Sequence, residues 1–522
     1  MAASPSAFSV LSSILYLLSS LLFILTASAQ TPLSDLVFTV GTTINDQSAH
    51  PWSYVLLGSP QPSLLAGKKF AFYAKAGYPT NAGTYTLRGT AFQQTDTTAI
   101  TALLNQSLAL GEDLTSLSNV MNMMLSGIAG ITSQPLAQKI ATGFQVAATD
   151  PNTATTLLLI ERLHPGLTLC AGHAFSETIS TTTTYEVREV NPATGAAGDV
   201  VGRVTIIPGS PVVLPAPGAA FQVVSNAPVD HLRIRLRWGT PDDLRRLSLL
   251  SFGYNVWRIG QSNAVASGYD VNPPTVPAQL YADPHFSRVN KQVVASAKTF
   301  TAGSGAGAAD DPADPVTVFF TDDNGHSPGT ATFPTNFPTP PGYLAAPFND
   351  GDQFYYFITA RDVLGRDGLV SPPCLARACR RLPPQAPTQV RVANATINTN
   401  QPRLLVTWQQ NTNAADKVAE YWIYRWLNAS MVLTNDAVPL SNRVGVVSQA
   451  LNTNVNSFLD NNPDSPSAPG ASNFWYTVRA VSHAACADLL SPHSGPAWGV
   501  VRQRAAPLAA TGEVLGSCGT PL

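Results

Sequence analysis

Charged residues are scarce in this 522-residue chain: Asp, Glu, Lys and Arg together make up only 12% of it. An ordinary soluble domain has about 25%. The formal net charge is −2, so no long-range field attracts nucleic acid or an anionic membrane surface, and we expect no nucleic-acid partner. Disordered chains combine high charge with few apolar residues. Hydrophobic residues here reach 44%, which predicts folded cores.

Cysteine is also scarce. An odd number of cysteines cannot all pair within one chain, and the five are Cys170, Cys374, Cys379, Cys486 and Cys518. So few exclude a disulfide-dense scaffold, and none shows the paired CxxC spacing of a zinc site. Cys374 and Cys379 are near enough in sequence to close a small loop after export.

A membrane-spanning run is absent. The apolar stretch at residues 14–25 is too short to cross a bilayer as a helix, and no later stretch approaches ~18 apolar residues. It leads into Ala27-Ser28-Ala29, the small-x-small pattern that signal peptidase cleaves. The sequence predicts a signal peptide over residues 1–29, cut after Ala29, and a secreted, periplasmic or cell-surface protein. Because no Lys or Arg precedes the run, an uncleaved anchor is the alternative.

Catalytic motifs are absent too. There is no G-x-S-x-G, and Gly303-Ser304-Gly305 lies in a Gly/Ala-rich tract without a strand-turn-helix pattern. Gly67-Lys68 lacks both the following Ser/Thr and the earlier Gly of a phosphate-binding loop. There is no HExxH. We therefore predict no catalytic, cofactor-binding or metal-binding residues, and no cofactor.

Some polar residues are nevertheless candidates for metal-binding or catalytic sites. His164 and His173 are nine residues apart, and we expect solvated turn histidines rather than a metal pair. A carboxylate pair for glycoside hydrolysis could come from Glu161, Glu177, Glu186 and Glu189, although exposed strand carboxylates are the expectation. Thr321–Gly325 clusters oxygens that calcium would accept but lacks the D-x-D-x-D-G spacing, so a turn is expected.

Residues 30–210 read as an N-terminal β domain interrupted by helices. Short alternating runs punctuated by Gly, Pro and Asn predict strands, at 36–40, 52–57, 69–75, 84–88, 167–171, 183–190 and 200–207. Between about 97 and 163 the period changes to that of an amphipathic helix, with a stripe of Leu114, Leu117, Met121, Met124, Leu125 and Ile128. We expect three or four helices in this insertion.

The ends of these helices can also be predicted. Glu112 and Asp113 are expected in a first helical turn, and Asp150-Pro151 as a cap followed by the first helical position. The latter helix should stop at His164-Pro165-Gly166. A small cap packed on the sandwich is the favoured role for the insertion, over a mobile lid or partner-binding face. Met121, Met123 and Met124 are accordingly read as core, with Met123 off the stripe.

The chain after the Pro cluster at 208–217 compares with itself. Leu232–Trp238 matches Arg403–Trp408, and Gly253–Arg258 matches Glu420–Arg425. Phe354–Ala360 matches Phe474–Ala480, and in both copies Ser-Pro begins eleven residues after the Ala. Such shared spacing indicates a repeated module, at about 211–378 and 379–506.

These residues resemble the fibronectin type III module: a Trp closing the second strand, a Tyr-rich third strand, an aromatic-x-aromatic-x-aliphatic-x-Ala sixth strand, and a Pro-rich start at 383–387. The resemblance extends over about 383–505 and, less fully, 212–375. Over 30–208 it is only sandwich-like. It implies a mainly β chain of tandem fibronectin type III/immunoglobulin-like sandwiches, with Trp238 and Trp408 in their cores. Phe354 and Phe474 stand where the family has a Tyr, so its corner hydrogen bond should be missing.

The family's adhesion tripeptide Arg-Gly-Asp does not occur. The corresponding loop reads Gly365-Arg366-Asp367-Gly368, so adhesion is not carried over from it, and exposed loops in general remain the expected contact surface. Residues 507–522 read as a linker or the start of a further module.

We therefore expect a non-catalytic, exported bacterial scaffold or adhesion-type protein that binds protein or carbohydrate at a cell surface. One alternative is a set of accessory modules of an extracellular carbohydrate-active or proteolytic enzyme whose catalytic domain lies outside this chain. Another is an undescribed enzyme in the N-terminal domain. That requires a pocket beside the helices with two or more converging carboxylates or histidines; a solid apolar seam would exclude it.

Overall fold

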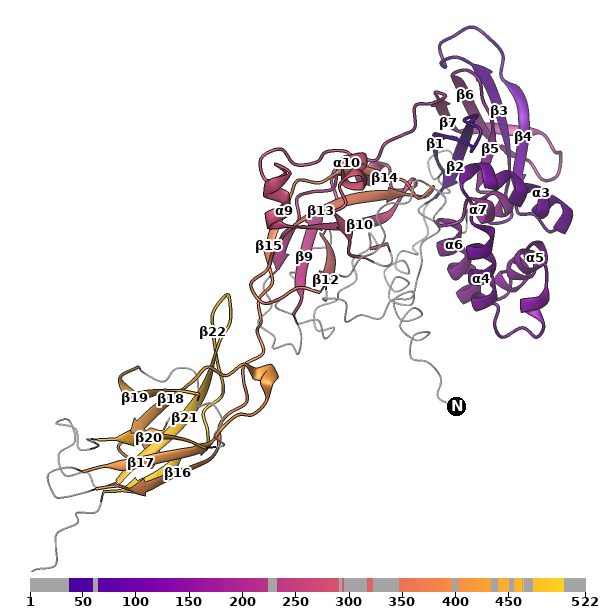
Figure 1. Ribbon diagram of the computed structural model, residues 1–522. Coiled ribbons are helices and arrows are strands. Elements are labelled where there is room, and N and C mark those ends of the chain that lie inside the picture. Colours follow the sequence, from indigo (N-terminus) through magenta and orange to yellow (C-terminus); the bar gives the residue numbers. More distant parts are fainter. Residues whose placement is uncertain are drawn as a thin grey trace, which may run out of the picture. The chain divides into compact units, whose positions relative to one another are not determined.

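The computed structural model describes residues 37–59, 64–223, 232–290, 293–294, 317–322, 347–396, 402–432, 440–449, 455–461, 463 and 473–501. Its contacts form two compact units. The first unit contains two sandwiches, and the second contains one (Figure 1). The predicted signal peptide, the Gly303-Ser304-Gly305 tract, Cys518 and residues 507–522 lie outside the described residues.

The first sandwich consists of two antiparallel sheets that enclose one core. The smaller sheet has the order β1-β2-β5 and the larger β4-β3-β6-β7. Their bounds are β1 Phe38–Asn45, β2 Pro51–Gly58, β3 Lys69–Ala76, β4 Thr86–Phe92, β5 Ala174–Thr178, β6 Thr183–Val190 and β7 Ala197–Ile206. Alternating residues of both sheets point inward, and the ring of Phe72 stacks on Phe175 at 4.7 Å between centroids. This strand order makes the region a full sandwich.

The helical insertion lies between the fourth and fifth strands of that sandwich. It has five helices rather than three or four and ends at residue 171 rather than 163: α3 Thr97–Ser107, α4 Leu114–Met124, α5 Leu136–Ala147, α6 Pro151–Glu161 and α7 Pro165–Ala171. The predicted stripe packs as core, with Leu117, Met121 and Leu125 buried and Met124 partly buried. Met123 is exposed. The insertion therefore has its own hydrophobic core.

Aspartates begin three of these helices. Asp96, Asp113 and Asp150 each accept hydrogen bonds from two main-chain N–H groups in the first turn of α3, α4 and α6. These bonds satisfy donors that have no partner within the helix. The cap predicted at Asp150 is confirmed. Glu112, expected in the first turn of α4, instead precedes the Asp113 cap.

The predicted strand at 167–171 is wrong, because these residues form α7. Pro165 supplies the first helical position, and Gly172 ends the helix in the left-handed conformation at φ 81°. Every residue of α7 is buried, so its sequence, which is apolar or small except for Thr168, lacks the 3.6-residue stripe. A short buried helix and a short buried strand cannot be distinguished by periodicity.

The middle sandwich has the same strand order within its two sheets as the first sandwich. Its smaller sheet is β8-β9-β12, and its larger is β11-β10-β13-β14 with β15 also paired to β13. The strands are β8 Phe221–Val223, β9 Ile234–Gly239, β10 Ser251–Gly260, β11 Ser287–Arg288, β12 Thr317–Asp322, β13 Gln353–Asp362, β14 Asp367–Val370 and β15 Cys374–Arg377. The short helices are α8 Asp242–Arg246, α9 Gln261–Ala266 and α10 Pro277–Ala282.

The C-terminal sandwich forms the second unit. Its sheets are β16-β17-β20 and β19-β18-β21-β22, with β23 also paired to β21. The strands are β16 Thr388–Asn394, β17 Leu404–Gln409, β18 Glu420–Trp426, β19 Arg443–Ser448, β20 Val455–Asp460, β21 Asn473–His483, β22 Asp488–Leu490 and β23 Ala497–Val500. Trp238 and Trp408 are 0% and 1% exposed in their sandwich cores, as predicted. The chain is thus a mainly β protein of tandem fibronectin type III/immunoglobulin-like sandwiches.

Phe354 and Phe474 carry no hydroxyl, as expected, but a different tyrosine ties the end of the fifth strand to the sixth in both repeats. Tyr356 and Tyr476, two residues after the Phe positions, donate to Asp322 at 2.8 Å and Asp460 at 2.7 Å. In the middle sandwich Asp322 also pairs with Arg258 at 2.7 Å. The partner of Asp460 in the C-terminal sandwich is Arg425, at 2.9 Å. Burial and the adjacent carboxylate raise the pKa of both tyrosines.

The first sandwich contains a variant of this Arg–acid–Tyr cluster. The Tyr185 hydroxyl donates to Glu177 on β5 at 2.7 Å, and Arg88 pairs with Glu177 at 2.8 Å. Here the arginine comes from the fourth strand, because Ala74 stands opposite Tyr185 on the third. The cluster therefore recurs in all three sandwiches.

The disulfide joins Cys379 to Cys486, not Cys374 to Cys379. It connects the segment before β16 to the turn between β21 and β22 within the second unit. Cys170 and Cys374 are buried free thiols, and burial raises their pKa to about 12 and about 11. Both are therefore protonated and unreactive at neutral pH.

Candidate binding pocket

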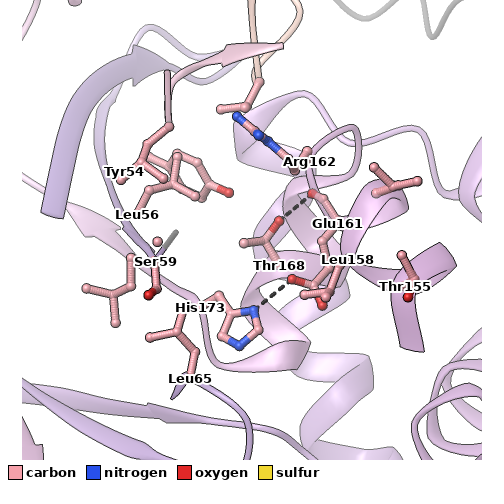
Figure 2. A pocket seen from close by; sticks show the side chains of 15 residues that line it. Tyr54, Leu56, Ser59, Leu65, Thr155, Leu158, Glu161, Arg162, Thr168 and His173 are labelled. Carbon is pink, nitrogen blue, oxygen red and sulfur yellow. Dashed lines mark hydrogen bonds and ion pairs between the residues drawn. The ribbon is translucent and has the colours of Figure 1, made fainter. Parts of the chain in front are cut away.

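A pocket opens beside the inserted helices, where β2 faces α6 (Figure 2). Its volume is about 250 Å³, and most of its wall is aliphatic, including Leu56, Leu65 and Leu158. Leu249 and Val363 of the middle sandwich, in the same compact unit, complete it. The region beside the helices therefore contains a pocket and not the solid apolar seam that would have excluded an enzyme there.

Local sequence explains why these walls face each other. Val55 of β2 packs in the core of the sandwich, whereas its neighbours Tyr54 and Leu56 line the pocket; α6 is apolar from Leu157 to Ile160. Gly58, at the end of β2, lies so close to Leu249 that a Cβ atom there would be 1.9 Å from Leu249 Cδ2. Glycine is the residue that permits this approach of the two sandwiches.

One acid–base pair lies in the pocket wall. Glu161, at the end of α6, accepts a hydrogen bond from His173 Nδ1 at 2.7 Å (Figure 2). The side chains are 9% and 14% exposed. Burial opposes protonation of the imidazole, but the charge and hydrogen bond of Glu161 outweigh it, so the pKa of His173 lies above its ordinary value. The pair converges as an N-terminal enzyme would require.

Arg162 adds a second cationic group to the same wall. It follows Glu161 at the C-terminal cap of α6, and its guanidinium donates to the carbonyls of Ser248 and Ser251, the latter at 3.0 Å. Among the described residues it has no carboxylate within ion-pair distance. The wall therefore carries two basic groups against the single carboxylate of Glu161.

A second Glu–His pair is fully internal. His164 Nδ1 lies 2.8 Å from Glu112 Oε1, and Gly166 N–H donates to Glu112 Oε2 at 2.8 Å. A Cβ at Gly166 would be 2.7 Å from Ser107 Oγ. Glu112 thus anchors the start of α7. Both histidines predicted to be solvated are instead largely buried beside glutamates.

The other glutamates weighed for catalysis are held apart in separate ion pairs. Glu177 binds Arg88, Glu186 binds Arg188 and Arg203, and Glu189 binds Lys68. The hydrogen bonds and charges of Arg188 and Arg203 outweigh the effect of burial, so the pKa of Glu186 lies below its ordinary value. Of the four predicted carboxylates, only Glu161 reaches the pocket.

The calcium and adhesion candidates are engaged elsewhere. Asp322 takes part in the buried cluster with Arg258, and Asp323–Gly325 lie outside the described residues. Arg366 binds Asp362 and the Thr42–Thr43 segment of the first sandwich. Asp367 accepts hydrogen bonds from Asn255 and Thr359 at 2.8 Å each, and from Tyr281. Burial raises its pKa.

Within the part of the chain that the structure describes, no three His, Cys, Asp or Glu side chains cluster as metal ligands. No helix in that part is long and apolar enough to cross a membrane.

Sequence reasoning missed the pocket because its polar groups come from separate elements. Glu161 and His173 are 12 residues apart, with a chain reversal between them. The sequence signal was Pro165, shortly after the end of α6. A chain that ends one helix and starts another can bring residues on the two sides of the break, such as Glu161 and His173, close together. The assignment of 167–171 to a strand removed that possibility.

Comparison with known proteins adds little to this description. No protein-family model matches the chain, and no curated protein matches it. Among solved structures, the chain is similar to the FN1–FN3 domains of chicken CNTN1, with 11% sequence identity, covering 89% of this chain and 98% of that chain at a TM-score of 0.20. The assignment of fold therefore rests on the strand order and cores described above.

Proposed function

We propose that this chain is an exported, non-catalytic modular protein whose sandwiches carry surfaces that bind protein or carbohydrate at a cell surface. Three sandwiches with one strand order and separate cores support a modular role. The Cys379–Cys486 disulfide supports an oxidising location, in agreement with the predicted signal peptide and cleavage after Ala29.

The observation that carries this proposal is the outer face of the larger C-terminal sheet. Trp498 on β23 is 58% exposed and lies opposite Trp475 on β21. Trp422 on β18 is partly exposed, with the Arg443 guanidinium 4.4 Å from its ring centroid. Aromatic side chains with arginine are enriched where proteins bind partners. This aromatic face is the contact surface that we propose.

The middle sandwich is the internal comparison for this face. By the repeat alignment and the strand pairing, the positions of Trp422 and Trp498 are held there by Asn255 and Leu375. The exposed tryptophans are therefore a feature of the C-terminal sandwich that the middle sandwich does not share.

A binding assay tests the proposal. The purified chain is incubated with insoluble polysaccharides and with cell-surface fractions of the producing organism, and retention is measured by sedimentation. We expect retention that Trp498→Ala and Trp422→Ala reduce and that Phe38→Ala, a matched change at a 52% exposed aromatic of the first sandwich, leaves unchanged. No retention, or equal retention of all variants, would contradict the proposal.

A second candidate function, catalysis by the first unit, is favoured by the Glu161–His173 pair in an otherwise apolar pocket. Such a pair can act as a general base. Turnover of chromogenic esters or glycosides that His173→Gln abolishes would replace the non-catalytic proposal. Turnover that the variant retains would not come from this pocket.

A further inference from the structure

The pocket between β2 and α6 has the size of a ligand site. A cavity of about 150 Å³ lined by aliphatic side chains holds a benzene molecule. The pocket here is about 250 Å³, which accommodates about eight to ten non-hydrogen atoms on that scale. Leu56, Leu65 and Leu158 offer an apolar occupant dispersion contacts on several sides. The interior therefore suits a flexible or branched hydrocarbon chain.

The polar part of the wall determines which head group fits. Because Glu161 engages Nδ1 of His173, the remaining ring nitrogen is Nε2, and His173 lines the pocket. In the protonated ring Nε2 is a hydrogen-bond donor, and the raised pKa of His173 favours that form. Arg162 also lines the pocket, on the other side of Glu161 and Thr168 from His173 in Figure 2, and adds a positive charge. Two positive charges, offset by one carboxylate, favour an anionic acceptor.

We propose that the pocket binds a small aliphatic monocarboxylate, with its hydrocarbon chain among the leucines and its carboxylate toward His173. Glu161 orients the imidazole and disfavours a second anion deeper in the pocket. A neutral alcohol with the same chain would lose the charge-assisted hydrogen bonds, and an alkyl ammonium would face both cationic groups. The ligand is distinct from the cell-surface partner proposed for the aromatic face, which lies in the other unit.

Calorimetric titration of the full chain with hexanoate, hexanol and hexylamine tests the head group. The three probes share a six-carbon chain. We expect saturable hexanoate binding that is at least about tenfold tighter than hexanol binding, as charge-assisted hydrogen bonds require, and no hexylamine binding. Equal affinity for hexanoate and hexanol, or no hexanoate binding at millimolar concentration, would overturn the proposal.

Two variants locate the site. His173→Gln should weaken hexanoate binding about tenfold and leave hexanol binding unchanged. The matched control is His483→Gln, because His483 Nδ1 also contacts a carboxylate, Asp488, at 2.7 Å but belongs to the second unit, none of whose residues lines the pocket. Hexanoate binding that survives His173→Gln unchanged, or falls equally with His483→Gln, would overturn the assignment.

Leu158→Trp fills the pocket and should abolish hexanoate binding. Leu158 is only partly buried, and circular dichroism with a thermal scan establishes that the variant is folded. Leu158→Ala enlarges the same pocket and is the second variant, in which binding of octanoate should improve relative to hexanoate. Full hexanoate binding by folded Leu158→Trp would place the ligand elsewhere and contradict the proposal.

Discussion

In the C-terminal sandwich the outer face of the larger sheet exposes Trp498 and part of Trp422, whereas the middle sandwich has Leu375 and Asn255 at the corresponding positions. Both sandwiches have aromatic residues on both faces of the third and sixth strands. In the middle sandwich the segment after the third strand includes α9 and α10, which pack on Trp257 and Phe357. The two modules thus differ both in which residues the outer face carries and in which segments pack on it.

The comparison predicts a large difference between inner and outer tryptophans. Trp408→Ala should lower the free energy of unfolding of the second unit by about 3–5 kcal/mol, because it removes a buried ring and leaves a cavity. Trp498→Ala should change it by no more than about 0.5 kcal/mol. Calorimetry of the full chain measures both. Similar effects would mean that the two faces of the sheet are not packed differently.

Removal of the acid from the Arg–acid–Tyr cluster should cost more stability in the sandwiches where the cluster is more deeply buried. In the middle sandwich Arg258 and Asp322 are 4% and 7% exposed, so Asp322→Asn should cost about 3–5 kcal/mol because it removes the negative charge that faces the buried guanidinium of Arg258.

The same change in the first sandwich should matter less. Arg88 and Glu177 are 48% and 18% exposed, and Glu177→Gln should cost about 1 kcal/mol or less because water screens the pair. Asp460→Asn, with Arg425 16% exposed, should fall between them. Denaturant unfolding followed by hydrogen exchange of each sandwich gives the order, and a reversed order would contradict the role assigned to burial.

Reduction should distinguish the second unit from the first. Cys379 and Cys486 are 107 residues apart in sequence, and loss of this cross-link should destabilise the second unit by about 2–4 kcal/mol. The first unit, whose described cysteines Cys170 and Cys374 are free, should unfold as before. A dithiothreitol series with Cys379→Ser/Cys486→Ser as reference checks this. An equal shift in both units would show another cross-link.

The smallest expected effect is a pH dependence in the first unit. Since the pKa of His173 is raised in the folded protein, its contribution to stability is present below the unfolded value of about 6.5 and is lost as pH rises through the folded value. The thermal midpoint of the first unit should therefore fall as the pH is raised from about 6.5. His173→Gln should remove this component. A midpoint that rises over this range because of His173 would contradict the Glu161 pairing.

The sequence was sufficient for the two later sandwiches because each contains a Trp, a Tyr-rich third strand and an alternating sixth strand. The first sandwich lacks a core Trp and uses Phe70, Phe72 and Tyr185 instead. Its strand order was therefore predicted only as sandwich-like. Its cluster also differs, with Glu177 and Arg88 at positions that the repeat comparison does not align.

The pocket was less predictable than the fold. Sequence periodicity identifies which face of a helix is buried, but not whether the facing surface fills it. Leu158 and Leu56 could equally have met in a closed seam. The buried states of His164 and His173 depend on glutamates brought near by the α6–α7 reversal, and no local pattern encodes that reversal once α7 is taken for a strand.

The central claim is that residues 37–206 form a sandwich of their own, the first of the three, whose strands pair across the helical insertion. A disulfide cross-link tests this claim most directly. Trp52 on β2 pairs with Thr178 on β5, on opposite sides of the insertion. The double variant Trp52→Cys/Thr178→Cys should form a disulfide under oxidation, found by peptide mapping, as should the reference pair Thr388→Cys/Gln409→Cys between β16 and β17. If the reference pair forms a disulfide and Trp52→Cys/Thr178→Cys does not, β2 and β5 are not neighbours and residues 37–206 do not form the first sandwich.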